Sequence, residues 1–259
     1  MTVNESGLMT STQSSPKVAI VTGAGSGIGA ATALEFASSG IRVLGVGRRE
    51  EALRRTAKQH SLIDYVTADL HEPTAPDEVV RTAVERWGRL DVVVNNAGTY
   101  LQAPLQEVSD DAVSDLITIH IVAPTRLTRA ALPLLKASRG SVVNISSTYG
   151  HRPIPGSSHY GAVKAALEHL TQSWALELAP DGIRVNAVAP GPTESEVITA
   201  AGFTAAEKEA IAAAQIEMIP LRRRGTPEDI ARWIVHLAGP DADWVTGQIL
   251  TVDGGLELL

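Results

Sequence analysis

A regular alternation along the chain constrains its fold most. Short β-branched runs alternate with longer stretches of helical periodicity from Lys17 onward. This pattern is typical of βαβ units, in which each helix crosses back over a parallel sheet. The runs predict seven strands, at residues 18–22, 42–46, 63–67, 92–95, 141–145, 184–188 and 248–252. We therefore expect an α/β protein whose parallel strands are flanked by helices.

The helical stretches carry readable start and stop signals. Thr226 is an N-cap candidate with Pro227 at the first helical position, and Thr204 has the capping-box spacing to Glu207. Gly88 is placed to end the helix that precedes it. No linker or shift in composition divides residues 17–259, which predicts a single domain. Residues 1–16 are polar and are expected to form a disordered tail.

The bulk composition narrows the class of protein. The formal net charge of −7 argues against a nucleic-acid partner, because phosphate backbones recruit surplus lysine and arginine. The absence of cysteine excludes disulfides, thiolate metal sites and thiol catalysis. No stretch reaches the roughly 18 consecutive apolar residues of a membrane span. We expect a cytoplasmic protein with no membrane partner, and the histidines and carboxylates show no metal-ligand spacing.

A glycine-rich turn follows the first predicted strand directly and opens the next helix. It comprises Gly23, Gly25, Ser26, Gly27, Ile28 and Gly29, with Ala24 between the first two glycines. Glycines let a backbone approach a pyrophosphate, and the first amides of the helix point at it. Alone, such a cluster is also compatible with an ordinary tight turn, but its place after the first strand favours a dinucleotide site.

The end of the second strand bears on cofactor choice. An NAD-binding protein usually places an acidic residue there, against the ribose hydroxyls. Here the chain has Gly47 followed by Arg48 and Arg49. Because arginine pairs with a 2′-phosphate that a carboxylate would repel, the sequence favours NADP(H), with NAD(H) possible and Arg48 as the preferred ligand. The alternative is two solvated arginines at a helix start.

Two residues four positions apart predict acid–base chemistry. If residues 160–164 are helical, the phenol of Tyr160 and the ammonium of Lys164 project from one face, about one turn apart. The ammonium then favours the phenolate, which turns tyrosine into a usable proton donor. In isolation the pair would be an incidental helix contact.

Further motifs make the chain resemble the short-chain dehydrogenase/reductase family. Beyond the glycine turn they are Asn95-Asn96-Ala97-Gly98, Ser147, Tyr160-x-x-x-Lys164, Pro190-Gly191 and Asp253-Gly254-Gly255. Their order and spacing match the family from about residue 17 to residue 255. The resemblance implies a Rossmann-type, doubly wound sheet of seven parallel strands flanked by helices. It also implies a homotetramer or homodimer.

The resemblance assigns roles along the cofactor. It implies Asp69 and Leu70 near the adenine, Lys164 on the nicotinamide ribose and the stretch after Pro190 at the carboxamide. The family commonly has threonine where this chain has Ser195, and Thr193 is an alternative donor. The full set of implied cofactor-binding residues is the glycine turn with Arg48, Asp69, Leu70, Asn96, Ala97, Gly98, Tyr160, Lys164, Pro190, Gly191, Thr193 and Ser195.

The resemblance also implies a mechanism of carbonyl reduction. The nicotinamide delivers hydride to the carbonyl carbon, Tyr160 protonates the oxygen, and Ser147 holds that oxygen by a hydrogen bond. Ser146 adjoins Ser147, but the thirteen-residue spacing to Tyr160 selects Ser147. The expected substrate is a small-molecule carbonyl or alcohol.

One member of the usual catalytic tetrad is replaced. Where most relatives carry an asparagine that supports a kink and a proton-carrying water, this chain has His120. In one interpretation its neutral imidazole serves the same water chain, and its titration near pH 6 to 7 adds a pH dependence. In another it is a satisfied, partly buried histidine beside a weakened relay. In a third it marks decayed turnover, which motivates an alternative function: a nucleotide-binding regulatory or scaffold protein of this fold.

Substrate choice is expected to come from residues 99–103, 149–159 and 194–221, the last as a lid. His151 and His159 flank the serine and tyrosine, either as substrate contacts or as surface histidines. With two phenylalanines and four tyrosines in the chain, the sequence predicts a pocket that is not an aromatic cage.

Overall fold

The computed structural model describes residues 15–194 and 204–259 of the chain. The predicted disordered tail lies almost wholly outside these residues. Seven parallel strands form one sheet in the order β3-β2-β1-β4-β5-β6-β7. The strands are β1 (Val18–Thr22), β2 (Arg42–Gly47), β3 (Ile63–Thr67), β4 (Val92–Asn95), β5 (Ser141–Ile145), β6 (Arg184–Pro190) and β7 (Ile249–Val252). The predicted doubly wound α/β fold is confirmed.

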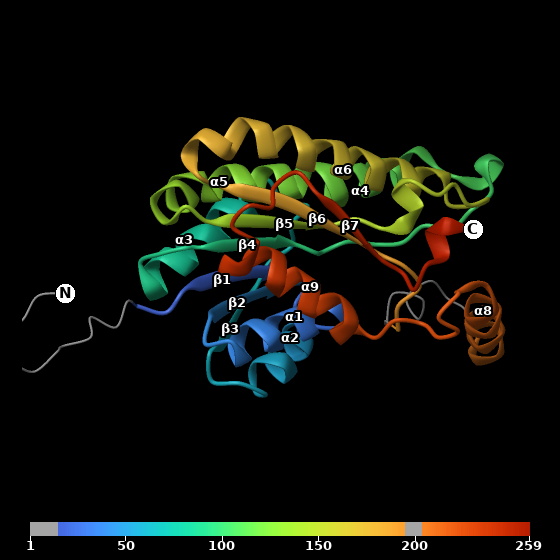
Figure 1. Cartoon of the computed structure of the whole chain (residues 1–259), viewed down its shortest axis with the longest axis horizontal. Coiled ribbons are helices and arrows are strands. Elements are labelled where there is room, and N and C mark those ends of the chain that lie inside the picture. Colours follow the sequence, from blue (N-terminus) through green and yellow to red (C-terminus); the bar gives the residue numbers. More distant parts are fainter. Residues whose placement is uncertain (1–14, 195–203) are drawn as a thin grey trace, which may run out of the picture.

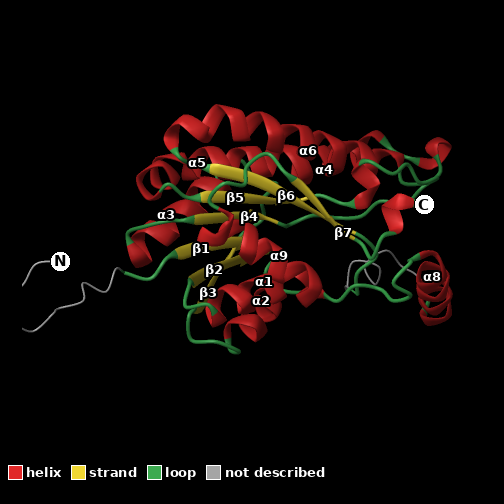
Figure 2. Cartoon of the chain, in the orientation of Figure 1, coloured by secondary structure: helices red, strands yellow, loops and turns green. Residues whose placement is uncertain are grey.

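Helices cover both faces of the sheet (Figure 1). One layer contains α3 (Ala75–Trp87), α4 (Asp110–Ile117), α5 (Ala123–Ser138) and α6 (Ser158–Leu178). The other contains α1 (Gly27–Ser38), α2 (Glu50–Ala57) and α9 (Pro227–Ala238), while α8 (Ala205–Met218) lies beyond the carboxyl ends of the strands. Figure 2 shows the sheet in yellow between the two layers of red helices.

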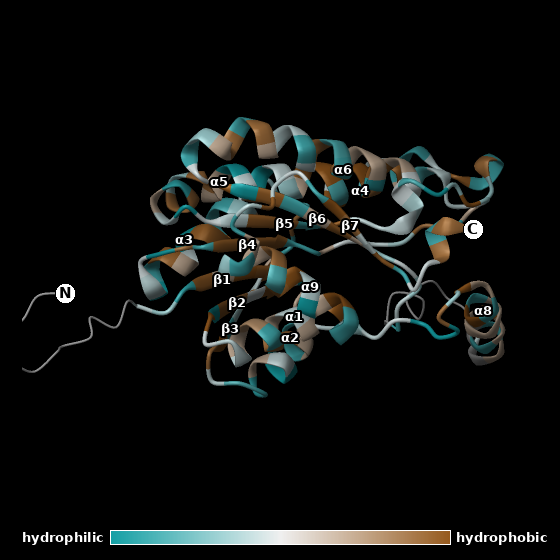
Figure 3. Cartoon of the chain, in the orientation of Figure 1, coloured by the Kyte–Doolittle hydropathy of each residue, from teal (hydrophilic) through white to brown (hydrophobic). Residues whose placement is uncertain are grey.

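The β-branched runs form the sheet because they can be buried on both sides. Along β1, Val18 and Ile20 point into the core beneath α3 and α5, whereas Ala19 and Val21 point into the core beneath α1 and α9. Successive side chains of a strand face opposite ways, so a strand covered on both faces must be apolar throughout. Figure 3 accordingly shows brown, hydrophobic strands at the centre.

The helix ends follow the predicted signals. Thr226 and Asp229 form a capping box at the start of α9, in which each side chain accepts the other residue's backbone amide. Thr204 and Glu207 do the same for α8. Gly88 adopts the left-handed conformation that ends α3. Among the described residues, no helix is long and apolar enough to cross a membrane.

The strand order creates the place for a ligand. The chain leaves β1 toward β2 and β3, then returns to lay β4 on the other side of β1. At such a switch point the loops after the two strands diverge and leave a crevice outside their carboxyl ends. The glycine turn follows β1 and the Asn96–Gly98 turn follows β4, so the two meet at this crevice.

Candidate active site

The glycine turn has the geometry of an anion cradle. Helix α1 begins at Gly27, and the side chain of its N-cap residue Ser26 makes no capping hydrogen bond, so the first amides of the helix stay available. A Cβ at Gly29 would lie 2.5 Å from Asn96 Nδ2 and would clash with the carbonyl oxygen of Gly23. Only glycine at this position therefore lets the start of α1 pack this closely against the turn and the Asn96 side chain, an arrangement compatible with a dinucleotide pyrophosphate at the helix N-terminus.

Thr22, at the end of β1, fixes the neighbouring turn. Its hydroxyl oxygen accepts the backbone amides of Asn96 and Ala97, each at 2.9 Å. The Asn96 side-chain amide donates back to the Thr22 carbonyl oxygen at 2.7 Å. These three bonds hold the predicted cofactor-binding segment against the glycine turn. Thr22 itself was not among the predicted site residues, although it opens the glycine motif.

Two arginines, Arg48 and Arg49, directly follow β2, and Asp69 follows β3 on the neighbouring strand. Arg48 is exposed, and its Nη1 lies 3.9 Å from Asp69 Oδ2. Arg49 Nη2 donates to the hydroxyl of Ser26 at 3.0 Å, so Arg49, and not only the predicted Arg48, reaches the glycine turn. Leu70 has its side chain in the core, which leaves only its backbone to face an adenine.

The stretch after β6 closes the other side of the crevice. Gly191 pairs with the end of β7 through its amide and the Val252 carbonyl at 3.0 Å, directly after Pro190. The Thr193 hydroxyl donates to the Gly191 carbonyl oxygen at 3.0 Å, and Arg224 Nη2 donates to the Thr193 carbonyl oxygen at 2.8 Å. The predicted donor Ser195 lies outside the described residues.

Ser147, Tyr160 and Lys164 converge at the carboxyl end of β5. Ser147 follows the strand and caps a short 3₁₀ turn, accepting the Tyr149 amide at 3.2 Å. Tyr160 and Lys164 lie in the first two turns of α6, as the spacing predicts. Lys164 Nζ donates to the Ile145 carbonyl oxygen at 2.7 Å and lies 5.5 Å from the centre of the Tyr160 ring. Both hydroxyls and the ammonium are thus brought together.

Burial sets the protonation of this pair. Desolvation lowers the pKa of Lys164 to about 7, although Glu168 one turn further along α6 opposes the shift. Desolvation also raises the pKa of Tyr160 well above its usual range, and a hydrogen bond with Ser147 only partly offsets this. The phenol therefore holds its proton at neutral pH, which is the state that a general acid needs before reduction.

His120 lies in a π-helical turn, Thr118–Val122, between α4 and α5. Its Nε2 pairs with the Thr99 carbonyl oxygen at 2.9 Å, so this nitrogen carries the proton and Nδ1 is left as an acceptor. The ring packs edge-on to Tyr160, with centroids 5.7 Å apart, and leaves no room for a Cβ at Gly98. The irregular helix is retained here although the usual asparagine is missing.

The predicted titration of His120 near pH 6 to 7 is wrong. Desolvation, with the charge of Lys164 adding to it, lowers the pKa of His120 to about 3. The imidazole is only 3% exposed and is neutral throughout the physiological range. A pH dependence of activity near neutrality therefore has to come from another group, and Lys164 is the candidate.

Burial of neutral His120 predicts how the free energy of unfolding depends on pH. Between its folded pKa of about 3 and its ordinary value of 6.5, the unfolded chain binds more protons, so stability falls as the pH drops below 6.5. From pH 7 to pH 5 this group alone should cost about 2 kcal/mol. Denaturant unfolding at both pH values should show a smaller loss for His120→Asn than for the wild type. Equal losses in the two proteins would contradict the assignment.

Three of the four tyrosines gather at the site, although their small number in the sequence predicts a pocket that is not an aromatic cage. Tyr100 lies edge-on to Tyr160 with ring centroids 5.0 Å apart, and Tyr149 does so at 6.2 Å. All three rings are partly exposed. Composition gave no sign of this, because the rings come from segments far apart in the sequence.

A polar network adjoins Ser147 and joins Ser146, Glu168 and His151. The Ser146 hydroxyl donates to Glu168 Oε1 at 2.6 Å, and His151 Nδ1 lies 3.4 Å from the same oxygen. His151 Nε2 lies 2.5 Å from Glu257, near the C-terminus. His151 is thus held between two carboxylates, through both of its ring nitrogens. Sequence reasoning missed Glu168 because its role depends on contacts with distant segments.

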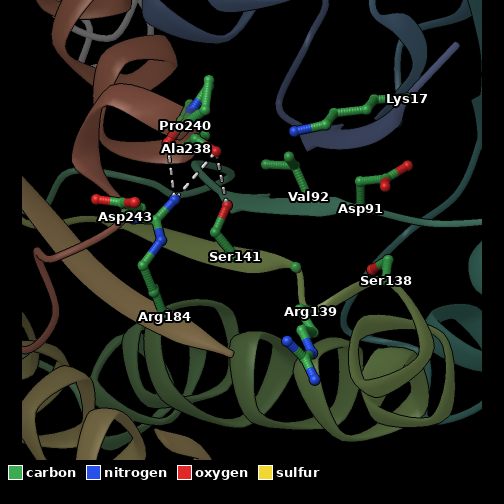
Figure 4. A pocket seen from close by; sticks show the side chains of 12 residues that line it. Lys17, Asp91, Val92, Ser138, Arg139, Ser141, Arg184, Ala238, Pro240 and Asp243 are labelled. Carbon is green, nitrogen blue, oxygen red and sulfur yellow. Dashed lines mark hydrogen bonds between the residues drawn. The ribbon is translucent and has the colours of Figure 1, made fainter. Parts of the chain in front are cut away.

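A second hollow lies at the opposite, amino ends of the strands (Figure 4). Its most buried cation, Arg184, donates to the carbonyl oxygens of Ala238 and Gly239 at 3.2 and 3.0 Å, and so caps the end of α9. The guanidinium group in this hollow is therefore used to hold the end of α9. Within the described ranges, no group of three or more histidine, aspartate or glutamate side chains is placed to hold a metal ion.

Comparison with known proteins gives consistent matches over nearly the whole chain. Residues 23–257 match the family described as enoyl-(acyl carrier protein) reductase. The 3-oxoacyl-(acyl-carrier-protein) reductase FabG of Thermotoga maritima is 36% identical over 247 residues, which cover 93% of this chain and 98% of the relative.

Solved structures agree with the sequence matches. A 3-ketoacyl-(acyl-carrier-protein) reductase from Brucella melitensis in complex with NADH has a TM-score of 0.87 at 31% identity, covering 93% of this chain and 98% of that one. An actinorhodin polyketide ketoreductase variant with NADPH has a TM-score of 0.87 at 32% identity, covering 94% and 98%.

Proposed function

Because the chain belongs to the short-chain dehydrogenase/reductase family of oxidoreductases, we propose that it is an NADP(H)-dependent enzyme that interconverts a carbonyl and an alcohol. The observation that carries the proposal is the convergence of Ser147, Tyr160 and Lys164 beside the crevice between the glycine turn and the Asn96–Gly98 turn. Reduction is the favoured direction, since the similar FabG protein is named as a 3-oxoacyl-(acyl-carrier-protein) reductase and the similar polyketide protein as a ketoreductase.

When bound, the nicotinamide cofactor supplies the hydride for the carbonyl carbon. The chain's own residues bind and protonate the carbonyl oxygen. The Ser147 hydroxyl holds it by a hydrogen bond, and Tyr160 donates the proton as negative charge develops on it. Because burial keeps the phenol protonated, the proton is in place before the hydride arrives. In the reverse direction Tyr160 acts as the base.

Lys164 favours the phenolate that Tyr160 becomes after donating its proton. Its ammonium lies against the tyrosine ring and is fixed by the Ile145 carbonyl oxygen. With a pKa of about 7, Lys164 exchanges protons readily near neutral pH and is suited to return one to the phenolate. His120, whose Nδ1 is an acceptor, packs edge-on against the same ring.

We expect His120→Asn to retain kcat within about threefold of the wild type, or to raise it. Asparagine offers the same combination of a donor for the Thr99 carbonyl oxygen and an acceptor for a relay water. Steady-state kinetics with NADPH and a ketone tests this, with His120→Leu as the control that removes both groups. Loss of activity as large as that of Tyr160→Phe would contradict it.

Cofactor choice rests on the two arginines at the end of β2. Arg48 is exposed beside Asp69, and Arg49 is held at the glycine turn by Ser26, so their guanidinium groups flank the place expected for a 2′-phosphate. Charge-assisted hydrogen bonds contribute about 1.5–3 kcal/mol each, so the Arg48→Ala/Arg49→Ala protein, which loses two of them, should lose roughly 10²- to 10⁴-fold in kcat/KM for NADPH.

The same double variant should keep its kcat/KM for NADH, which has no 2′-phosphate. The ratio of the two values is the measurement, and Arg55→Ala serves as a control with a cation removed from elsewhere on α2. A wild type that uses NADH as well as NADPH would overturn the proposed cofactor preference.

The alternative is a nucleotide-binding regulatory or scaffold protein with weak turnover, suggested by the replacement of asparagine by His120. Following NADPH absorbance with a panel of ketones, aldehydes and diketones separates the two. Oxidation of NADPH by at least one carbonyl, above the rate without substrate, supports the enzyme. Binding of NADPH with no oxidation by any member of the panel supports the scaffold.

A further inference from the structure

Tyr100 and Tyr149 form an aromatic wall around the hydroxyl-bearing residue Tyr160. The centroids of Tyr100 and Tyr149 are 6.4 Å apart, and each ring lies nearly perpendicular to that of Tyr160, at interplanar angles of 84° and 89°. All three rings remain partly exposed. A substrate that brings its carbonyl to Tyr160 must therefore lay its neighbouring atoms against aromatic surface.

The wall is held in place before any substrate binds. The Tyr100 hydroxyl lies 2.9 Å from the Ser157 hydroxyl, and the Ala103 amide donates to the Gly156 carbonyl oxygen at 2.8 Å. These two bonds tie the loop after β4 to the loop before α6. The Tyr149 amide is bonded to Ser147 itself. The rings are thus fixed relative to the catalytic serine and tyrosine.

Two cations act on the tyrosine rings. Lys164 Nζ lies 5.5 Å from the centre of the Tyr160 ring, and Arg152 acts electrostatically on Tyr149. His120 is neutral. A fixed aromatic surface favours planar rings over saturated ones, because aromatic pairs gain from edge-to-face or offset contact beyond the area that they bury.

We propose that the wall of Tyr100 and Tyr149 selects carbonyl substrates that carry an aromatic ring next to, or one carbon away from, the carbonyl group. This inference rests on the proposed reductase function and specifies its substrate class.

The test compares two ketones that differ only in their ring, 1-phenylpropan-2-one and 1-cyclohexylpropan-2-one. Neither carbonyl is conjugated, so their intrinsic reactivities are similar. We expect kcat/KM with NADPH to be roughly 3- to 10-fold higher for the phenyl ketone, the factor that one aromatic contact supplies. Tyr100→Leu and Tyr149→Leu should each reduce this preference, whereas Tyr100→Phe, which keeps the ring, should retain it.

Tyr65→Leu is the matched control, because Tyr65 lies on β3 away from the wall and its loss should leave the preference unchanged. A wild-type ratio near one, or a ratio that survives in both leucine variants, would overturn the inference. Equal turnover of the two ketones would do so while leaving the reductase function intact. No oxidation of NADPH with any carbonyl tested would instead remove both proposals.

Discussion

Replacing Tyr160 with phenylalanine is expected to lower kcat about 10³-fold, within the range that general acid–base groups contribute. The substitution removes the hydroxyl that donates the proton but keeps the ring that packs against Tyr100, His120 and Lys164. Stopped assays with NADPH and a ketone measure the loss. Binding of NADPH, followed by fluorescence titration, should change by only a few-fold.

Thermal unfolding of Tyr160→Phe should resemble that of the wild type, because the buried contacts of the ring remain. That control separates lost chemistry from lost structure. A fall in kcat of less than tenfold, in a protein that still binds NADPH, would mean that another group donates the proton.

Lys164→Met is expected to lower kcat by about 10²-fold or more. Methionine fills similar space but cannot favour the phenolate or return a proton to Tyr160. Because folding buries Lys164 and lowers its pKa to about 7, removing the ammonium should relieve a desolvation cost. The loss of one hydrogen bond to the Ile145 carbonyl oxygen works in the opposite direction.

The melting temperature of Lys164→Met should therefore stay close to that of the wild type, or rise, while activity collapses. This combination is the signature of a group retained for function at the expense of stability. Differential scanning fluorimetry beside the kinetic assay tests it. A variant that loses stability and activity together, or neither, would contradict the assigned role.

The strands could be predicted because each one is buried on both faces and must be apolar along its whole length. All seven lie at the predicted positions. Their ends were less certain: β6 runs two residues further than predicted, to Pro190, because Val252 on β7 pairs with it there. The last residues of a strand depend on its partner, which a local pattern does not contain.

The proposed catalytic residues could be located from the sequence because their spacing is local. Tyr160 and Lys164 needed only one helix, and the glycine turn needed only a strand followed by a helix. The aromatic wall was missed because Tyr100 and Tyr149 are brought together by loops after different strands. The low pKa of His120 likewise depends on burial beside Lys164, which no pattern of neighbours in the sequence reveals.

The two arginines after β2 could be predicted only in part. The sequence placed two arginines after β2, but only the structure joins Arg49 to Ser26 in the glycine turn. The contacts of His151 could not be predicted for the same reason, since its partners Glu168 and Glu257 come from α6 and from the C-terminal turn. Long charged side chains find partners that a chain position alone does not specify.

Hydride transfer itself is the central claim, and isotope transfer tests it most directly. NADPH carrying deuterium at the transferable position should be mixed with the enzyme and a reducible ketone, and the alcohol product examined by mass spectrometry. We predict one deuterium on the carbinol carbon, at a rate that falls about 10³-fold in Tyr160→Phe. Tight binding of NADPH with no deuterium in any product, across ketones, aldehydes and diketones, would contradict the account.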